Sequence, residues 1–297
     1  MTDSIRRVFT RFGQPGRRTD AFLTHGHRIL SSSAGVEAVL STACYTLLFV
    51  HSRLRRVLER QYERLAFALV SQASEAMLPG ETILATIDPP RTWLSESCAT
   101  VKALADMTAD VRMFIRLWGL VGIYSWARNN YVKPPGDVIL KTLVWAQVGA
   151  KTLYQVLENG AYLASKGVLR GDRWAEREPK WWVWSNRFWL AHTSLEFLRL
   201  LRVRQLRYNE DFGAKTVIDE NSDAGIADDR VKVQSAGLKR DWQRDLYSAA
   251  GWVPVTLHRS FKHQSQSTAS EAWIGLCGMV PGVVGLVQAW EQTQNGL

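Results

Sequence analysis

Few side chains in this sequence combine the residue type and the spacing that catalysis or metal binding requires. His25 and His27 are separated by one residue, so on a helix their rings would point to different sides, and no third ligand lies near them in the sequence. Cys44, Cys98 and Cys277 are far apart and form no CxxC pair, which fits a reducing compartment rather than a disulfide scaffold. The GxGxxG, Walker, GxSxG and HExxH motifs are also missing. We therefore predict no catalytic residue, no metal site and no bound cofactor.

Two carboxylates, Asp106 and Asp110, have a spacing that acid–base chemistry could use. They are four residues apart and would share one face of a helix. Because Arg112 and Arg116 follow closely, ion pairing on the helix surface is the favoured interpretation. A membrane-attached enzyme stays an alternative, and it would require His, Asp and Cys side chains to converge in the fold.

The charge balance points to a polyanionic partner. The chain of 297 residues carries 37 basic and 28 acidic residues, a formal net charge of +9. Most of the basic residues are arginine, whose planar guanidinium binds phosphate groups in pairs of hydrogen bonds. Nucleic acid and anionic lipid headgroups are both candidates. No helix-turn-helix, RNA-recognition or zinc-finger signature is present, and the basic residues are spread along the chain, so we predict no nucleic-acid partner.

The clearest amphipathic pattern covers residues 51–69. Arginines recur on one face at a spacing of three to four residues: Arg53, Arg56, Arg60 and Arg64. Leucines line another face: Leu54, Leu58 and Leu65. This pattern has two interpretations. The helix is either a solvated surface in which Glu59 and Glu63 pair with the arginines, or a membrane-surface helix on an anionic phospholipid membrane.

Tryptophan is concentrated in WAEREPKWWVWSNRFW, residues 174–189. Three interpretations apply: a packed core, a platform that stacks bases or ligands, and a belt at a membrane–water boundary. Because the tryptophans from position 181 onward do not share one helix face, the boundary interpretation is favoured. The predicted interfacial anchors are Trp181, Trp182, Trp184 and Trp189, with Trp273 and Trp290 at the two ends of a later apolar segment.

That later segment, residues 273–290, is the strongest candidate for a transmembrane helix. Its eighteen residues contain no charge, and a helix of this length extends about 27 Å, close to the hydrocarbon thickness of about 30 Å. Four glycines form a ridge of small residues that would let another helix approach closely: Gly275, Gly278, Gly282 and Gly285. The alternative is a buried C-terminal helix of a soluble protein.

Two further apolar segments are weaker candidates. Residues 138–165 contain Lys141, Lys151 and Glu158, each of which is unfavourable at the bilayer centre unless it is paired. Residues 38–50 are uncharged but too few to span a bilayer comfortably. The pattern therefore predicts an all-α, membrane-associated bundle of about six to eight helices, with amphipathic helices and one or two transmembrane helices.

The same patterns divide the chain into four regions. Residues 1–18 are expected to form a flexible basic tail, and residues 19–208 an amphipathic, membrane-associated helical region whose first helix covers residues 19–50. Residues 209–236 carry many carboxylates and are expected to form an acidic linker loop. Residues 237–297 are expected to form a helical hairpin that contains the transmembrane segment 273–290.

Taken in order, several segments resemble the peroxin-eleven family of peroxisomal membrane proteins, most closely its fungal C-type branch. The most specific segment is ADVRMFIRLWGLVGIYSWA at 109–127, followed by WIGLCGMVPGVVGLVQAW at 273–290. The resemblance covers about residues 19–297, and the acidic segment 209–236 is its variable insert.

This resemblance implies a function at the peroxisomal membrane. Members of the family elongate and remodel the organelle before division, associate with copies of themselves (a homo-oligomer), and recruit a dynamin-like fission machinery and its adaptors. Their basic amphipathic helix near the N-terminus inserts into the cytosolic leaflet. Here residues 19–50 carry little charge, so residues 53–69 are the better candidate on physical grounds.

A pore or carrier for small anionic metabolites is a second function that the resemblance implies. Helices 138–165 and 181–201 would line the path. Four cations on them would favour anions: Lys141, Lys151, Arg187 and Arg199.

Overall fold

The chain is α-helical throughout the part that the structure describes. The computed structural model describes residues 17–75, 92–218, 225–262 and 270–294. Within these ranges there are eight helices and no strand: α2 (Arg17–Leu30), α3 (Ser33–Glu75), α4 (Trp93–Arg116), α5 (Gly119–Val132), α6 (Val138–Ser165), α7 (Asp172–Ile218), α8 (Gly225–Arg259) and α9 (Glu271–Gln294). The predicted all-α class and the number of helices are confirmed.

Serine side chains divide the predicted first helix into two. The Oγ of Ser31 donates to the carbonyl of His27, and the Oγ of Ser32 accepts from the amide of Gly35, so one helix ends and the next begins at this pair. The expectation of one helix over residues 19–50 was therefore wrong. Serine side chains satisfy helix-end backbone groups readily, and this local competition outweighs the continuous apolar spacing.

The expected linker at 209–236 is mostly helical. Helix α7 continues to Ile218 and α8 begins at Gly225, which leaves only residues 219–224 outside the described part. The carboxylates and the two glycines that suggested a loop lower helix propensity by at most about 1 kcal/mol each. The expected tail, residues 1–18, lies outside the described residues except for its last two, which begin α2.

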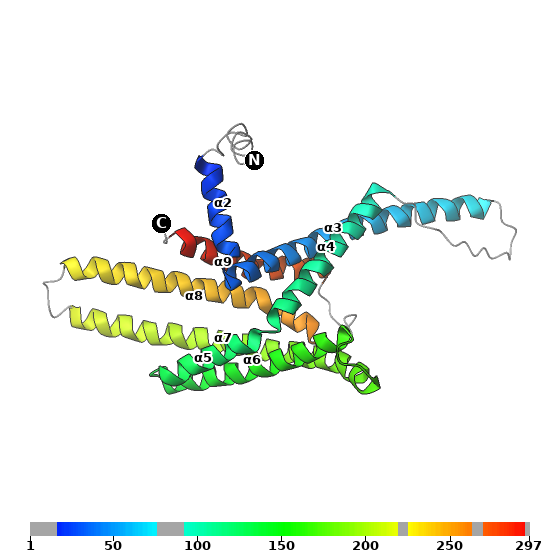
Figure 1. Cartoon of the computed structure of the whole chain (residues 1–297). Helices are drawn as coiled ribbons and strands as arrows, with labels where there is room; N and C mark the ends of the chain where they lie inside the picture. Colours follow the sequence, from blue (N-terminus) through cyan, green and yellow to red (C-terminus); the bar gives the residue numbers. More distant parts are fainter. Residues whose placement is uncertain (1–16, 76–91, 219–224, 263–269, 295–297) are drawn as a thin grey trace, which may run out of the picture.

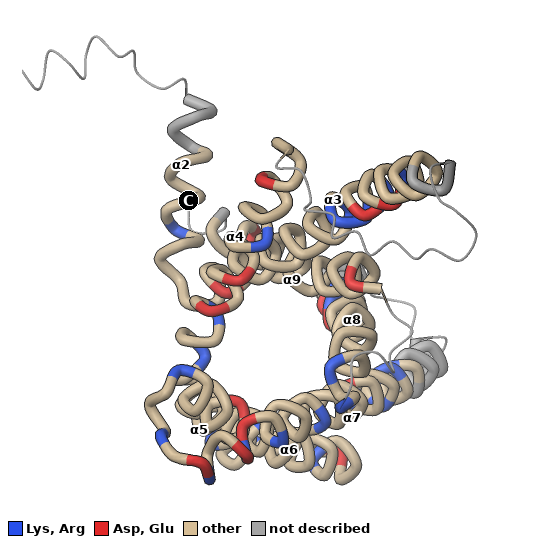
Figure 2. Tube along the Cα trace, turned by 90° about the vertical axis from the view of Figure 1, so that its right-hand side faces the viewer, with Lys and Arg blue, Asp and Glu red and all other residues tan. Residues whose placement is uncertain are grey.

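Helices α3 to α9 are arranged as a ring (Figure 2). Around it, α4 packs on α3, α3 on α9, α9 on α8, α8 on α7, α7 on α6 and α6 on α5. Helix α5 follows α4 directly in the chain, which closes the circuit. Helix α2 stands at the C-terminal end of α9, at a steep angle to α3 (Figure 1).

Hydrogen bonds from two side chains of α6 connect it to the end of α4, where the ring closes. Gln155 donates through Nε2 to the carbonyl of Arg116 at 2.9 Å, and Asn159 donates through Nδ2 to the carbonyl of Leu117 at 3.0 Å. These carbonyls belong to the C-terminal end of α4, where the helix supplies no partner of its own. These two polar side chains of α6 therefore cap the C-terminal end of α4 and connect the two helices.

Two helices of the described part are long and apolar enough to cross a membrane, α3 and α9. They pack antiparallel, since Gly275, Gly278, Gly282 and Gly285 of α9 face Phe49, Tyr45, Thr42 and Ala38 of α3 in that order. Helix α3 was not predicted as a span because Glu37 interrupts its uncharged run. In the structure, Arg112 of α4 pairs with that carboxylate at 2.8 Å, which removes much of the cost of placing a charge there.

Candidate functional site

Two adjoining cavities lie inside the ring. The larger has a volume of about 850 Å³ and is lined by α4 to α8, and the smaller has about 600 Å³ and also reaches α3. They share six lining residues: Arg116, Gly119, Gly122, Lys151, Trp189 and Trp252. Volumes of this size are typical of small-molecule sites, which occupy about 300–1,000 Å³.

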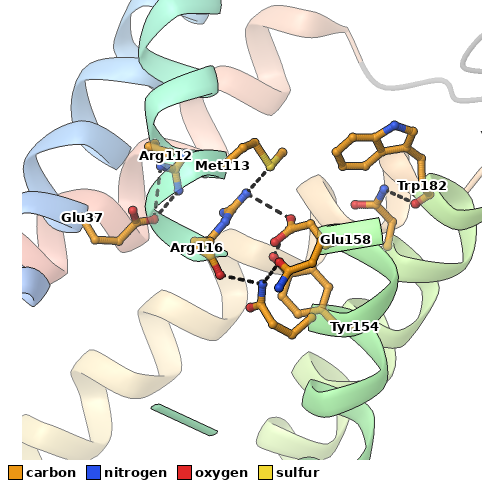
Figure 3. Close-up of polar contacts among 10 residues, drawn as sticks. Glu37, Arg112, Met113, Arg116, Tyr154, Glu158 and Trp182 are labelled. Carbon is orange, nitrogen blue, oxygen red and sulfur yellow. Dashed lines mark hydrogen bonds and ion pairs between the residues drawn. The ribbon is translucent and has the colours of Figure 1, made fainter. Parts of the chain in front are cut away.

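A buried ionic network borders the smaller cavity (Figure 3). Arg116 Nη2 lies 3.0 Å from Glu158 Oε1, and the hydroxyl of Tyr154 donates to the same oxygen at 2.8 Å. Next to it, Arg112 donates to Glu37 through Nη2 at 2.8 Å and through Nε at 3.2 Å. Burial raises the pKa of Tyr154, so the phenol remains a hydrogen-bond donor. The network ties α4 to both α3 and α6.

A second polar group lies at the other end of the larger cavity. Arg199 of α7 pairs with Glu196 on the same helix and, at 3.3 Å, with Asp245 of α8. The Nδ1–H of His192 donates to the carbonyl of Gln147 at 3.3 Å. Burial, together with the charge of Lys151, lowers the pKa of His192 to about 4, so the ring is neutral near pH 7.

Arg112 and Arg116 do not pair with the carboxylates that precede them in the sequence. Asp106 pairs with Lys102, and Asp110 pairs with Lys166 at 2.6 Å. Ion pairing on the helix surface is what the structure shows, but with different partners, because Arg112 and Arg116 turn inward to α3 and α6.

No group of three or more His, Cys, Asp or Glu side chains within the described ranges is placed to hold a metal ion. All three cysteines are buried and unbonded to one another. His25 stacks on Trp290 with ring centroids 4.9 Å apart, while His27 is exposed.

The predicted membrane-binding residues lie on the second half of α3, which runs out from the ring (Figure 1). Arg53, Arg60 and Arg64 are exposed and Arg56 is half-buried. None of the four has a described carboxylate within 4.0 Å, whereas Arg55, which was not singled out, pairs with Glu59 at 2.8 Å. Leu54 and Leu58 are half-buried, and Leu65 is exposed. These four cationic side chains therefore have no ion-pair partner among the described residues.

The predicted tryptophan anchors fall in different environments. Trp184 is exposed, and Trp181 and Trp182 are half-buried, with Trp181 covering Gly160 of α6. Trp189 is not an anchor, because only 7% of it is exposed and it packs against Tyr154 and Trp252 in the core. The sequence pattern could not show this, since both contacts come from other helices.

The other two predicted anchors lie near the two ends of α9. Trp273 is 53% exposed near the start of the helix. Trp290 is half-buried near its end, where Phe22 and His25 of α2 cover it. The glycine ridge between them is occupied by α3 of the same chain.

The cavity residues were largely missed by reasoning from sequence. A signal was present: Gln147, Lys151, Gln155 and Glu158 recur at helical spacing along α6, which is mostly apolar, and two of them, Lys151 and Gln155, line the larger cavity. A polar stripe of this kind in an apolar helix indicates a face turned toward a polar interior. Among the predicted pore residues, Lys151 and Arg199 line the larger cavity, while Lys141 and Arg187 do not.

Comparison with known proteins identifies one family. A sequence model described as peroxisomal biogenesis factor 11 (PEX11) matches residues 92–290, which cover α4 to α8 and most of α9. No curated protein and no solved structure matches. Helices α2 and α3 precede the matched region.

Proposed function

The chain belongs to the peroxisomal biogenesis factor 11 (PEX11) family, and we propose that this peroxisomal membrane protein elongates and remodels the membrane during proliferation and fission. We propose further that it does so without catalysis, by inserting an amphipathic helix into one leaflet. The family membership supports the role in peroxisome biogenesis, and the shape and charge of α3 support the mechanism.

The observation that carries this proposal is the change of character along α3. Its first half packs on α9 and is apolar enough to cross a membrane. After His51 the same helix carries the four arginines that have no described carboxylate partner, and it exposes apolar side chains such as Phe67 and Val70. A basic face beside an apolar face is what binds a helix to the headgroup region of an anionic membrane.

Insertion bends a membrane because it expands one leaflet. Helix α3 contains no glycine or proline after Gly35, so the span and the basic part form one continuous rod. Because the rod is straight, its basic part reaches the headgroup layer when α3 lies nearly parallel to the membrane surface, and the proposed mechanism takes this orientation. Helix α2 is a second candidate for insertion into the leaflet, because it exposes Phe22 and Leu23. The turn at Ser31 and Ser32 gives it a direction different from that of α3.

Self-association would require a surface other than the glycine ridge. The ridge is covered by α3, whereas the opposite face of α9 exposes a stripe at helical spacing: Trp273, Leu276, Val280, Val283 and Val287. We propose that copies associate through this face within the membrane. We also propose the dynamin-like fission machinery and its adaptors as partners, on the family resemblance alone.

A pore or carrier for small anionic metabolites is the second candidate function. The observation that favours it is the pair of cavities inside the ring, with the predicted path residues Lys151 and Arg199 on their walls. Helices α6 and α7 both contribute to this lining, as the second function requires.

Reconstitution of the purified chain separates the two functions. In liposomes that contain anionic lipid, the remodelling function predicts tubules by electron microscopy and no stepwise current in planar bilayers. Stepwise conductance without tubulation would support the pore instead and would contradict the remodelling proposal.

A further inference from the structure

Lys151 occupies the junction of the two cavities and lines both of them. Within the part of the chain that the structure describes, no carboxylate lies within 4.0 Å of its ammonium group, and Nζ lies over the ring of Tyr154, 4.9 Å from the centroid. The neighbouring carboxylate, Glu158, is already bonded to Arg116 and Tyr154. Lys151 is thus a cation on the cavity wall that has no carboxylate partner among the described residues.

Arg116 adds a second unused donor at the same junction. Its Nη2 is engaged by Glu158 and Met113, but its Nε is buried and has no hydrogen-bond partner among the described residues. Burial lowers the pKa of Lys151, as expected for an ammonium group held away from water. An anion beside Lys151 would give its ammonium group a partner and would also lie near the positive charge of Arg116.

The surrounding walls are mainly apolar. Trp189 and Trp252 lie at the junction with ring centroids 4.9 Å apart, and Ile123 and Val144 extend the apolar wall into the larger cavity. The carboxylates of the far end, Glu196 and Asp245, are both bonded to Arg199. The junction therefore combines a cationic centre with aromatic and aliphatic surface on either side.

We propose that this junction binds an anionic amphiphile, a molecule that joins a phosphate or carboxylate group to an apolar body. The anion accepts a hydrogen bond from Lys151 and lies near the positive charge of Arg116, and the apolar body lies against Trp189 and Trp252. The inference rests on the cavities alone, and it requires neither membrane remodelling nor conductance.

Photolabelling of the full chain in phosphatidylcholine nanodiscs tests this site. The probe is octyl phosphate with a diazirine at its terminal carbon, and the labelled residues are identified by mass spectrometry. We expect labels on cavity residues such as Ile123, Val144 or Trp252. Lys151→Met should reduce this labelling about tenfold or more, because it removes a charge-assisted contact.

Two further variants make the result specific. Lys141→Met removes an exposed charge from the same helix and should leave cavity labelling unchanged. Lys151→Arg keeps the charge and should retain labelling, which guards against a Met variant that fails to fold. Cavity labelling that is equal in the Lys151→Met and Lys141→Met proteins, or labels confined to the outer face of α9, would overturn the proposal.

Competition then identifies the source of the anion. Protection by excess inorganic phosphate assigns the site to a soluble anion, and protection by phosphatidic acid assigns it to a lipid headgroup; either result supports an anion site. Labelling that neither competitor reduces would count against it. As an independent readout, octyl phosphate should raise the thermal stability of the unmodified protein but not of the Lys151→Met protein.

Discussion

Gly275 of α9 lies against the backbone of Phe49 of α3, so closely that a methyl group added to the glycine would stand 2.8 Å from the amide nitrogen of Phe49. A backbone atom cannot move aside as a flexible side chain does. The two candidate membrane spans are thus in contact through their main chains, and glycine is what permits this approach.

Replacing this glycine should separate the two spans. We expect Gly275→Ala to lower the stability of the protein by about 1–3 kcal/mol, because the added methyl group forces α3 and α9 apart. Gly149 of α6 is the matched control, since nothing lies within 4 Å of a methyl group added there, and Gly149→Ala should be neutral or stabilising by up to about 1 kcal/mol. Thermal unfolding in detergent, followed by circular dichroism, measures both. Equal effects of the two substitutions would contradict the close α3–α9 contact.

Removing Glu158 should leave a buried charge without its partner. We expect Glu158→Leu to cost about 3–5 kcal/mol, because Arg116 would remain inside the ring unpaired. The double variant Arg116→Met with Glu158→Leu should recover most of that loss, since neither charge is then buried. Asp106→Ala, which breaks an exposed pair with Lys102, should cost less than about 1 kcal/mol. A double variant that is no more stable than Glu158→Leu would contradict this account of the network.

The neutral His192 predicts a loss of stability in acid. Its folded-state pKa of about 4 lies below the value of about 6.5 for an unfolded histidine, so the unfolded chain binds an extra proton between these two pH values. Stability should therefore fall as the pH drops from about 6.5 toward 4. In the His192→Gln protein the unfolding temperature should fall less between pH 7 and pH 5, whereas His27→Gln, at an exposed position, should follow the parent. Identical profiles for all three proteins would rule out this role of His192.

The sequence alone predicted those structural features that depend on residues close together in the chain. The uncharged run at 273–290 lies within α9, and its glycines lie where a close helix contact needs them. By contrast, Trp189 is in the core because Trp252 of α8 packs on it, a contact between residues distant in the chain. The span in α3 was missed for the same reason, since the partner of Glu37 lies on α4.

The cavities could not be predicted because they depend on closure of the ring. Closure depends on hydrogen bonds from Gln155 and Asn159 of α6 to the carbonyls at the end of α4. The spacing of residues in the sequence does not predict these bonds between separate helices. The residue types were visible, but their common orientation toward one enclosed space follows only from the arrangement of seven helices.

The central claim, that the basic half of α3 binds and bends an anionic membrane, depends on four arginines. We expect the full chain with Arg53, Arg56, Arg60 and Arg64 replaced by glutamate to lose binding to anionic vesicles, because headgroup attraction is worth about 1 kcal/mol for each cation near the surface. A matched protein with Lys133, Arg170, Lys239 and Lys262, exposed positions outside α3 and outside residues 174–189, replaced by glutamate controls for the change in net charge.

The most direct measurement is tubulation of anionic liposomes by these three proteins under electron microscopy at one protein-to-lipid ratio. The account predicts tubules with the parent chain and with the matched control, and smooth vesicles with the four-residue α3 variant. Tubules of equal number and diameter with the α3 variant would contradict the account.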